Sequence, residues 1–259
     1  MGNKLIDTHA HFLNNDLKFD TSEIESNLLR MDSIFHVAWN IESSEKILML
    51  FKTYKNLYPV VGIHPSHVIE KTSEDAIKEL ETIILNNQFQ IKAIGEIGID
   101  LFHTKETLEV QKVYFYEQLV LAKKYNLPIV LHIRNAFDEV FDILLKFQNL
   151  KLVIHSWNAS IEVLEKYKSL NHDLYFGING ILTFKNALDL HKSILNIPLD
   201  KILLETDMPY LSPIPYRGKK NQSIYLIEVA KKLALILNIS LEDVAFQTTK
   251  NARVFYELS

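Results

Sequence analysis

Cysteine is absent from this 259-residue chain. Its absence excludes a disulfide framework, a thiolate zinc site and a cysteine nucleophile. Glycine and proline are scarce, with seven of each, which excludes collagen-like and low-complexity chains. No run reaches the roughly 18 apolar residues of a membrane span, and the opening MGNKLID lacks the apolar core of a signal peptide. We therefore expect a globular protein in a reducing, cytoplasmic environment.

The chain also has no excess of basic over acidic residues. Lysine and arginine number 28 against 32 acidic residues, which gives a formal net charge of −4. Proteins that coat nucleic acid usually carry a strong positive charge, so this function is excluded. An enzyme that holds a few phosphates on a local patch is still compatible with the charge. No linker, internal repeat or charge run divides the sequence, and we expect residues 1–259 to form a single domain.

Short apolar runs recur along the chain, and each ends in a polar residue. The runs are LIDTHAH, FHVAWN, PVVGIH, IKAIGE, PIVLHI, KLVIHS, LYFGIN and KILLETD. The shortest gap between polar ends, from His132 to His155, is 23 residues, and the longest, from Glu96 to His132, is 36. One strand plus one helix in an eight-fold barrel takes about 31 residues.

Segments with helical periodicity lie between these runs, for example TSEDAIKELETIILNN and ETLEVQKVYFYEQLVLAKKYN. Apolar strands that alternate with helices indicate a parallel sheet covered on both faces. The sequence therefore predicts an α/β fold, a (β/α)8 TIM barrel, with the active site at the C-terminal ends of the strands. An open doubly wound sheet is the alternative, but no glycine-rich phosphate loop follows the first run.

Histidines and acids gather at these predicted strand ends. His9 and His11 are two residues apart and so face the same side of a strand, although an isolated pair of this kind also occurs on surfaces. Four imidazoles and two carboxylates exceed the three ligands of one catalytic zinc, whereas two ions that share a carboxylate use all six. The predicted metal ligands are His9, His11, Glu96, His132, His155 and Asp207. The remaining histidines, expected on surface helices and loops, are His36, His67, His103, His172 and His191.

In this interpretation His9, His11 and Asp207 bind one ion, His132 and His155 bind the other, and Glu96 bridges them. Two divalent ions per subunit, zinc, manganese or magnesium, would activate a shared water. The expected catalytic residues are Glu96, as the bridge, and Asp207, which would orient that water and take its proton.

Further residues are candidates for binding substrate phosphate: His64, Arg134, Arg217 and Asn221. Arg134 would otherwise form a salt bridge with Asp138 or Glu139, and the basic cluster around Arg217 would otherwise be a solvated loop. A helix that begins near Asn221 would present its backbone amides to a phosphate.

Other side chains near the strand ends have less certain roles. Glu205 is expected to orient a metal ligand, and Asp100 either to orient a ligand or to cap a loop. Trp157 would either stack on a nucleobase or pack against the protein, and the same alternatives hold for Tyr210 and Phe102.

The sequence resembles the TatD family of metal-dependent hydrolases, within the amidohydrolase-like superfamily, in its motifs and in their order along the chain. The matching segments, spread over essentially the whole chain, are DTHAHF, GIHP, AIGEIGID, HIR, KILLETDMPYLSP and RGKKN. The resemblance implies a two-metal barrel that cleaves phosphodiesters, often a deoxyribonuclease that works from the 3′ end, with the same ligand set. Two departures from the family pattern change no predicted ligand. In HSWNAS, Ala159 stands where many relatives have a glycine, and His67 lies one position later than the corresponding histidine of many relatives.

The sequence thus favours a metal-dependent hydrolase of ester bonds, specifically a 3′–5′ exodeoxyribonuclease. Its expected substrate is nucleic acid, as single-stranded or frayed DNA 3′ ends, with no membrane and no obligate protein partner. The alternative is a binuclear amidohydrolase that acts on an amide, ester or lactone, including D-aminoacyl-tRNA deacylation. A metal-binding scaffold without catalysis is a third interpretation, which the complete ligand set opposes.

Overall fold

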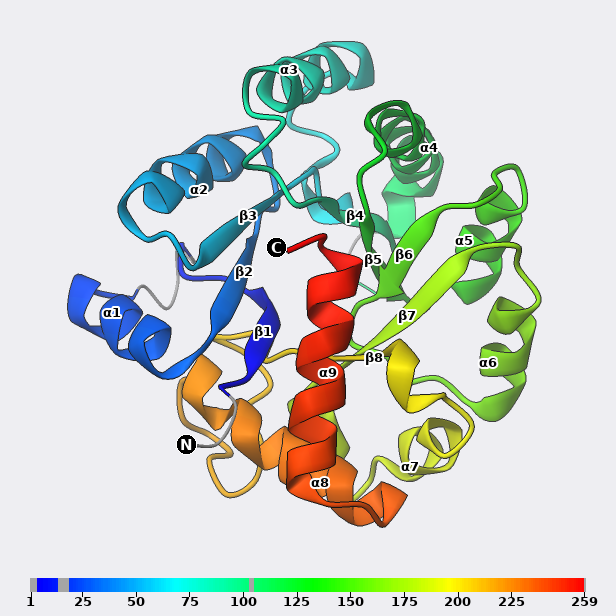
Figure 1. Ribbon diagram of the computed structural model, residues 1–259. Helices are drawn as coiled ribbons and strands as arrows, with labels where there is room; N and C mark the ends of the chain where they lie inside the picture. Colours follow the sequence, from blue (N-terminus) through cyan, green and yellow to red (C-terminus); the bar gives the residue numbers. More distant parts are fainter. Residues whose placement is uncertain (1–3, 14–18, 103–104, 259) are drawn as a thin grey trace. The chain divides into compact units, whose positions relative to one another are not determined.

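The computed structural model describes residues 4–13, 19–102 and 105–258. Strands and helices alternate along the chain (Figure 1), and the order of the strands in the sheet is their order in the sequence, β1 to β8, within the described residues. Contacts divide the chain into two compact units. The first contains Met1–His36, Ser156–Glu165 and Tyr175–Ser259, and the second contains Val37–His155 and Lys166–Leu174.

The first unit contains β1 (Ile6–Ala10), which pairs in parallel with β2 (Ser33–Val37), and β7 (Asp173–Ile178), which pairs with β8 (Ile202–Leu204). The last residue of β2 and the first two of β7 are assigned to the second unit. Backbone bonds from Asp207 N to His9 O (2.9 Å) and from His11 N to Met208 O (2.8 Å) join the end of β1 to the segment after β8. The helices here are α1 (Thr21–Arg30), α7 (Leu188–Ile194), α8 (Leu226–Leu237), α9 (Leu241–Phe255), η3 (Gly180–Thr183), η4 (Leu199–Lys201) and η5 (Ser223–Tyr225).

The end of α9 packs against β1 and β2 through aromatic side chains. The ring of Tyr256, just after α9, stacks on Phe35 of β2 at 3.7 Å, and its hydroxyl donates to Thr8 O of β1 at 3.1 Å. All three residues are buried. These contacts of Tyr256 therefore help to hold the strand that carries His9 and ends directly before His11.

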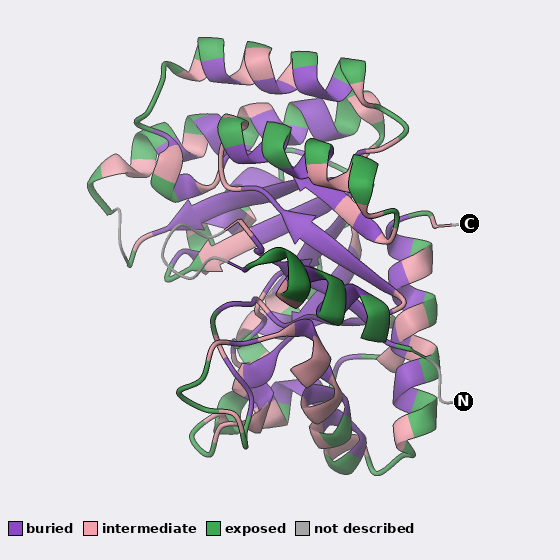
Figure 2. Cartoon of the chain, turned by 90° about the vertical axis from the view of Figure 1, so that its left-hand side faces the viewer, coloured by how far each residue is buried: buried purple, intermediate pink, exposed green. Residues whose placement is uncertain are grey.

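In the second unit, the strands β3 (Leu57–Val61), β4 (Ala93–Asp100), β5 (Ile129–Arg134) and β6 (Lys151–Ile154) pair in parallel in that order. Its helices are α2 (Ile41–Thr53), α3 (Ser73–Asn86), α4 (Leu108–Tyr125), α5 (Phe137–Leu144), η1 (Pro65–His67) and η2 (Lys105–Thr107). The helix α6 (Ile161–Lys168) has residues in both units. Figure 2 shows the strands as almost wholly buried and the helices as exposed along one face. This pattern is expected for parallel strands covered by helices.

Two buried glutamines of α4 hold the ends of the neighbouring strands. The side chain of Gln111 accepts from Asp100 N (2.8 Å) and donates to Asp100 O, and Gln118 makes the same pair of bonds with Ile63 (2.8 Å from its N). Both glutamines are fully buried. They satisfy the backbone N–H and C=O groups of Asp100, the last residue of β4, and of Ile63, which follows β3.

Each predicted run overlaps an observed strand, but β4 continues beyond Glu96 to Asp100, and the expectation for His36 is wrong. His36 lies in β2 and is fully buried. Its Nε2 accepts hydrogen bonds from Phe12 N and Leu13 N, both at 3.2 Å, so this nitrogen is satisfied away from water. His103 lies outside the described residues. No helix of the described part of the chain combines the length and the apolar character needed to cross a membrane. The single domain expected from the sequence stays a prediction.

Candidate metal centre

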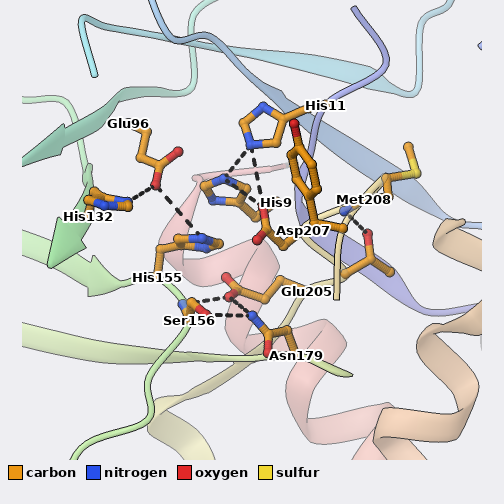
Figure 3. Close-up of polar contacts among 12 residues, drawn as sticks. His9, His11, Glu96, His132, His155, Ser156, Asn179, Glu205, Asp207 and Met208 are labelled. Carbon is orange, nitrogen blue, oxygen red and sulfur yellow. Dashed lines mark hydrogen bonds and ion pairs between the residues drawn. The ribbon is translucent and has the colours of Figure 1, made fainter. Parts of the chain in front are cut away.

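The first group of site residues, here called the His9 cluster, consists of His9, His11 and Asp207. The alternation of β1 turns both imidazoles to one side, and their Nε2 atoms lie 3.1 Å apart. Asp207 Oδ1 lies 3.5 Å from His11 Nε2 and 4.0 Å from His9 Nε2 (Figure 3). His9 is fully buried and His11 nearly so. Two imidazole nitrogens that converge beside a carboxylate oxygen form a donor set that fits a divalent transition-metal ion.

The second group, here called the Glu96 cluster, consists of His64, Glu96, His132 and His155. Glu96 Oε1 lies 2.6 Å from His132 Nδ1, 3.8 Å from His155 Nε2 and 3.9 Å from His64 Nε2 (Figure 3 shows the first two). Glu96 and His132 belong to β4 and β5, and the other two residues follow β3 and β6. One buried carboxylate oxygen that faces three imidazoles is again a donor set for a divalent cation.

Burial and the neighbouring charges shift the pKa values of His132 and His64 in opposite directions. Burial opposes the charged form of His132, but the charge of Glu96 and the hydrogen bonds to Asp100 and Glu96 outweigh it and raise the pKa of His132 to about 9. Burial, together with the nearby His132, lowers the pKa of His64 to about 3. An ion held by Glu96 and His132 would require an unprotonated imidazole nitrogen, so its binding would release the proton of His132.

Asp100 orients His132. Its Oδ2 lies 3.2 Å from His132 Nε2, so that this nitrogen can donate to Asp100 while Nδ1 faces Glu96. Its Oδ1 accepts from Phe102 N at 2.8 Å and shapes the turn after β4. The loop-capping role suggested for Asp100 is therefore present, and its role in orienting a metal ligand stays a prediction that the contact with His132 supports.

Glu205 holds the segment that follows His155. Its buried Oε1 accepts from Ser156 N at 2.7 Å and faces the amide of Asn179 at 3.5 Å (Figure 3). Ser156 has a left-handed backbone with φ of 53°. Gly177 leaves room for Glu205, because a Cβ at Gly177 would lie 2.3 Å from Oε2. The Glu205 carboxylate thus holds the backbone where the chain leaves β6, directly after His155, which is compatible with the predicted role of orienting a metal ligand.

The two arginines expected to bind phosphate lie on aromatic rings. The guanidinium of Arg134, at the end of β5, lies 4.0 Å from the centre of the Phe102 ring. That of Arg217 lies 3.9 Å from the ring of Phe184. Both arginines are exposed, and Asp138, the alternative partner of Arg134, is bonded to Lys166. These cation–π contacts help to position both guanidinium groups, and the phosphate-binding roles stay predictions.

The prediction that the side chain of Asn221 binds phosphate is wrong. Asn221 is fully buried, its amide donates to Thr206 O (2.9 Å) and Tyr210 O (2.6 Å), and its oxygen accepts from Gln222 N (2.9 Å). These bonds use both of its N–H groups. Its role is to close the loop after β8, and the next helical turn begins later, at Ser223.

Trp157 packs in the core. It is 2% exposed, its indole N–H donates to Ser193 Oγ at 3.1 Å, and its ring meets Phe176 edge-on at 4.9 Å. Tyr210 and Phe102, in contrast, are 45% and 58% exposed and stay candidates for base stacking.

Asp7 is a buried acid for which the sequence predicted no role, although it lies two positions before His9 and so belongs to the same face of β1. It is fully buried and bonded to Thr206 and Ser223. The signal that could have identified Asp7 is an acidic residue within the apolar run that precedes His-x-His.

Histidines and carboxylates at the ends of parallel strands define a class of protein, the α/β enzymes with a divalent-metal centre. The chain matches the model of the family described as "TatD related DNase" over residues 6–257. It is 33% identical to the uncharacterized metal-dependent hydrolase YabD of Bacillus subtilis, over 98% of this chain and all of YabD. It is also 33% identical to the uncharacterized metal-dependent hydrolase MG009 of Mycoplasma genitalium, over 96% of this chain and 98% of that protein.

Among solved structures, the chain is similar to YjjV, a TatD homologue from Escherichia coli, with a TM-score of 0.89 and 28% identity over 98% of each chain. The chain belongs to the TatD family of metal-dependent hydrolases. The predicted family and the predicted (β/α)8 barrel fold are thereby confirmed.

Proposed function

We propose that the chain hydrolyses phosphodiester bonds as a 3′–5′ exodeoxyribonuclease that uses two divalent ions. The observation that carries the proposal is the pair of donor sets, the His9 cluster and the Glu96 cluster, at the C-terminal ends of strands. Active sites of (β/α)8 enzymes are built there. In this proposal His9, His11 and Asp207 would hold one ion, His132 and His155 would hold the other, and the carboxylate of Glu96 would be shared by both.

When bound, the ions lower the pKa of a shared water and offset the charge of the phosphate. The chain's own residues supply orientation and proton transfer. Asp207 accepts a hydrogen bond from the attacking water and takes its proton. Asp100 keeps Nε2 of His132 engaged, so that Nδ1 is the nitrogen directed at Glu96.

His64 has a defined tautomer that suits a hydrogen-bond donor. Ser66 N donates to its Nδ1 at 3.1 Å, so the proton of the neutral imidazole is on Nε2, the atom that faces the Glu96 cluster. In the proposed reaction this N–H donates to a phosphate oxygen. The exposed Arg134 and Arg217 contribute charge for the neighbouring phosphates.

The choice of DNA rests on the family name, "TatD related DNase". A net charge of −4 suits a site that grips a few phosphates of a single-stranded or frayed end rather than a long duplex. No obligate protein partner is included in the proposal. The cytoplasmic location also stays a prediction.

The test is digestion of single-stranded DNA oligonucleotides labelled at the 3′ or the 5′ end, with magnesium, manganese or zinc. We expect stepwise shortening from the 3′ end, and its loss in Asp207→Asn, which keeps the shape of the side chain and removes its charge. No cleavage by protein that holds two ions would refute the nuclease proposal. RNA ends, aminoacyl-tRNA esters, amides and lactones would then be assayed, since the alternative function predicts hydrolysis of one of the last three.

A further inference from the structure

Asp7 is a fully buried carboxylate that the proposed chemistry does not use. Its Oδ2 accepts from Thr206 Oγ1 and Ser223 Oγ, both at 2.6 Å, and its Oδ1 accepts from Thr206 N at 2.9 Å and, more distantly, from His9 N at 3.4 Å. A buried carboxylate is costly unless donors surround it. The donors that surround Asp7 come from β1, from the segment after β8 and from the start of η5.

Thr206 extends these bonds to both sides of Asp207. Its backbone N–H is bound by Asp7, and its hydroxyl oxygen, which donates to Asp7, accepts from Met208 N at 3.2 Å. The peptide group before Thr206 and the peptide group after Asp207 are therefore both held. The peptide group between them is held too, because Asp207 N donates to His9 O at 2.9 Å.

Asp207 needs this support because its backbone is left-handed, with φ of 56°. A residue other than glycine in that region costs about 1–3 kcal/mol and keeps it only when its surroundings enforce it. Asn221 supplies a second restraint, because its amide bridges Thr206 O and Tyr210 O across the same turn.

We propose that Asp7 is a positioning residue of the metal centre: it acts through Thr206 to hold Asp207 in the left-handed conformation that directs its carboxylate at His9 and His11. The proposal rests on the proposed function in one respect, since it takes Asp207 as a metal ligand. The other interpretation is that Asp7 only ties β1 to β8 and affects the site no more than any buried bond would.

The test compares Asp7→Asn, Thr206→Val and the double variant. Thr206→Val removes only the hydroxyl, keeps the branched shape and leaves Asp7 in place, so it tests the relay even if Asp7→Asn folds poorly. The matched control is Asn251→Leu, which removes buried bonds to Leu199 O and Ile202 O at the opposite end of β8. The readouts are Mn²⁺ affinity by calorimetry, the free energy of unfolding in urea, and kcat and KM on the labelled oligonucleotide.

We expect each single variant to lower Mn²⁺ affinity about 10- to 100-fold, as typical for residues that orient a ligand. The double variant should bind no more weakly than the weaker single variant, because both changes break one relay. Asn251→Leu should lose stability and keep its Mn²⁺ affinity within about 3-fold of the unsubstituted chain.

Three results would overturn the proposal: affinities of both single variants within about 3-fold of the unsubstituted chain, fully additive losses in the double variant, or an equal loss in Asn251→Leu. Failure of the proposed function looks different. An unsubstituted chain that binds Mn²⁺ and cleaves no DNA refutes the nuclease, while the losses of affinity still support Asp7. A chain that binds no ion overturns both.

Discussion

Replacing Trp157 distinguishes packing from base stacking, the two roles that its sequence position allowed. Trp157→Phe keeps a ring against Phe176 but removes the indole N–H that donates to Ser193 and part of the buried volume. The lost hydrogen bond costs about 1 kcal/mol, and the volume left unfilled adds a similar amount or more. Ser193 Oγ still donates to Leu190 O at 3.3 Å, which limits the penalty. We expect a loss of about 2–3 kcal/mol, and of about 3–5 kcal/mol for Trp157→Ala.

The assay is urea unfolding beside binding of a single-stranded oligonucleotide. For a chain of this size, each kcal/mol lowers Tm by about 2–4 °C, so Trp157→Phe should melt about 5–10 °C lower. Its Kd for DNA should change less than about 2-fold. Base stacking would instead weaken binding by about 1–3 kcal/mol, roughly 5- to 150-fold, at unchanged stability. That result would refute the packing argument.

Three further predictions follow from other parts of the molecule. Gly98→Ala should cost at least about 3 kcal/mol in urea unfolding, because φ is 148° and a Cβ would lie 1.9 Å from His132 O; a loss below about 1 kcal/mol would contradict this. Burial lowers the pKa of His172 below its ordinary 6.5, so the folded state binds fewer protons than the unfolded one and the free energy of unfolding should fall as pH drops below about 6.5. His172→Gln should reduce that pH slope, and identical slopes would refute the assignment. Arg134→Ala, in the inactive Asp207→Asn background, should weaken DNA binding and reduce its salt slope by about one, whereas Lys231→Ala on α8 should not; equal slopes would remove Arg134 from the phosphate site.

The strand ends could be predicted from the sequence because parallel strands repeat one local pattern. An apolar run followed by a polar residue recurs at Glu96, His132 and His155. His132 lies in the C-terminal half of β5 and His155 directly after β6, whereas Glu96 lies in the middle of β4, which continues to Asp100. The spacing of His9 and His11 predicts their shared face, since side chains alternate along a strand.

Roles set by contacts between distant segments could not be predicted in the same way. Asp7 bonds to Thr206 across 199 residues, and nothing local to either residue indicates the pair. Asn221 looked like a phosphate ligand because it follows a basic cluster, but the carbonyls that occupy its amide belong to a turn 11 to 15 residues earlier. The burial of Trp157 likewise depends on Ser193, a partner on α7.

The most direct test of the two-metal centre is to count the ions bound to each chain. Mn²⁺ or Zn²⁺ would be measured by plasma mass spectrometry after equilibrium dialysis of the unsubstituted chain, His11→Ala and His132→Ala, with circular dichroism to check the fold. The account predicts two ions for the unsubstituted chain and one for each variant, because each substitution removes a ligand from a different cluster. A single ion in the unsubstituted chain, or two ions in both folded variants, would contradict it.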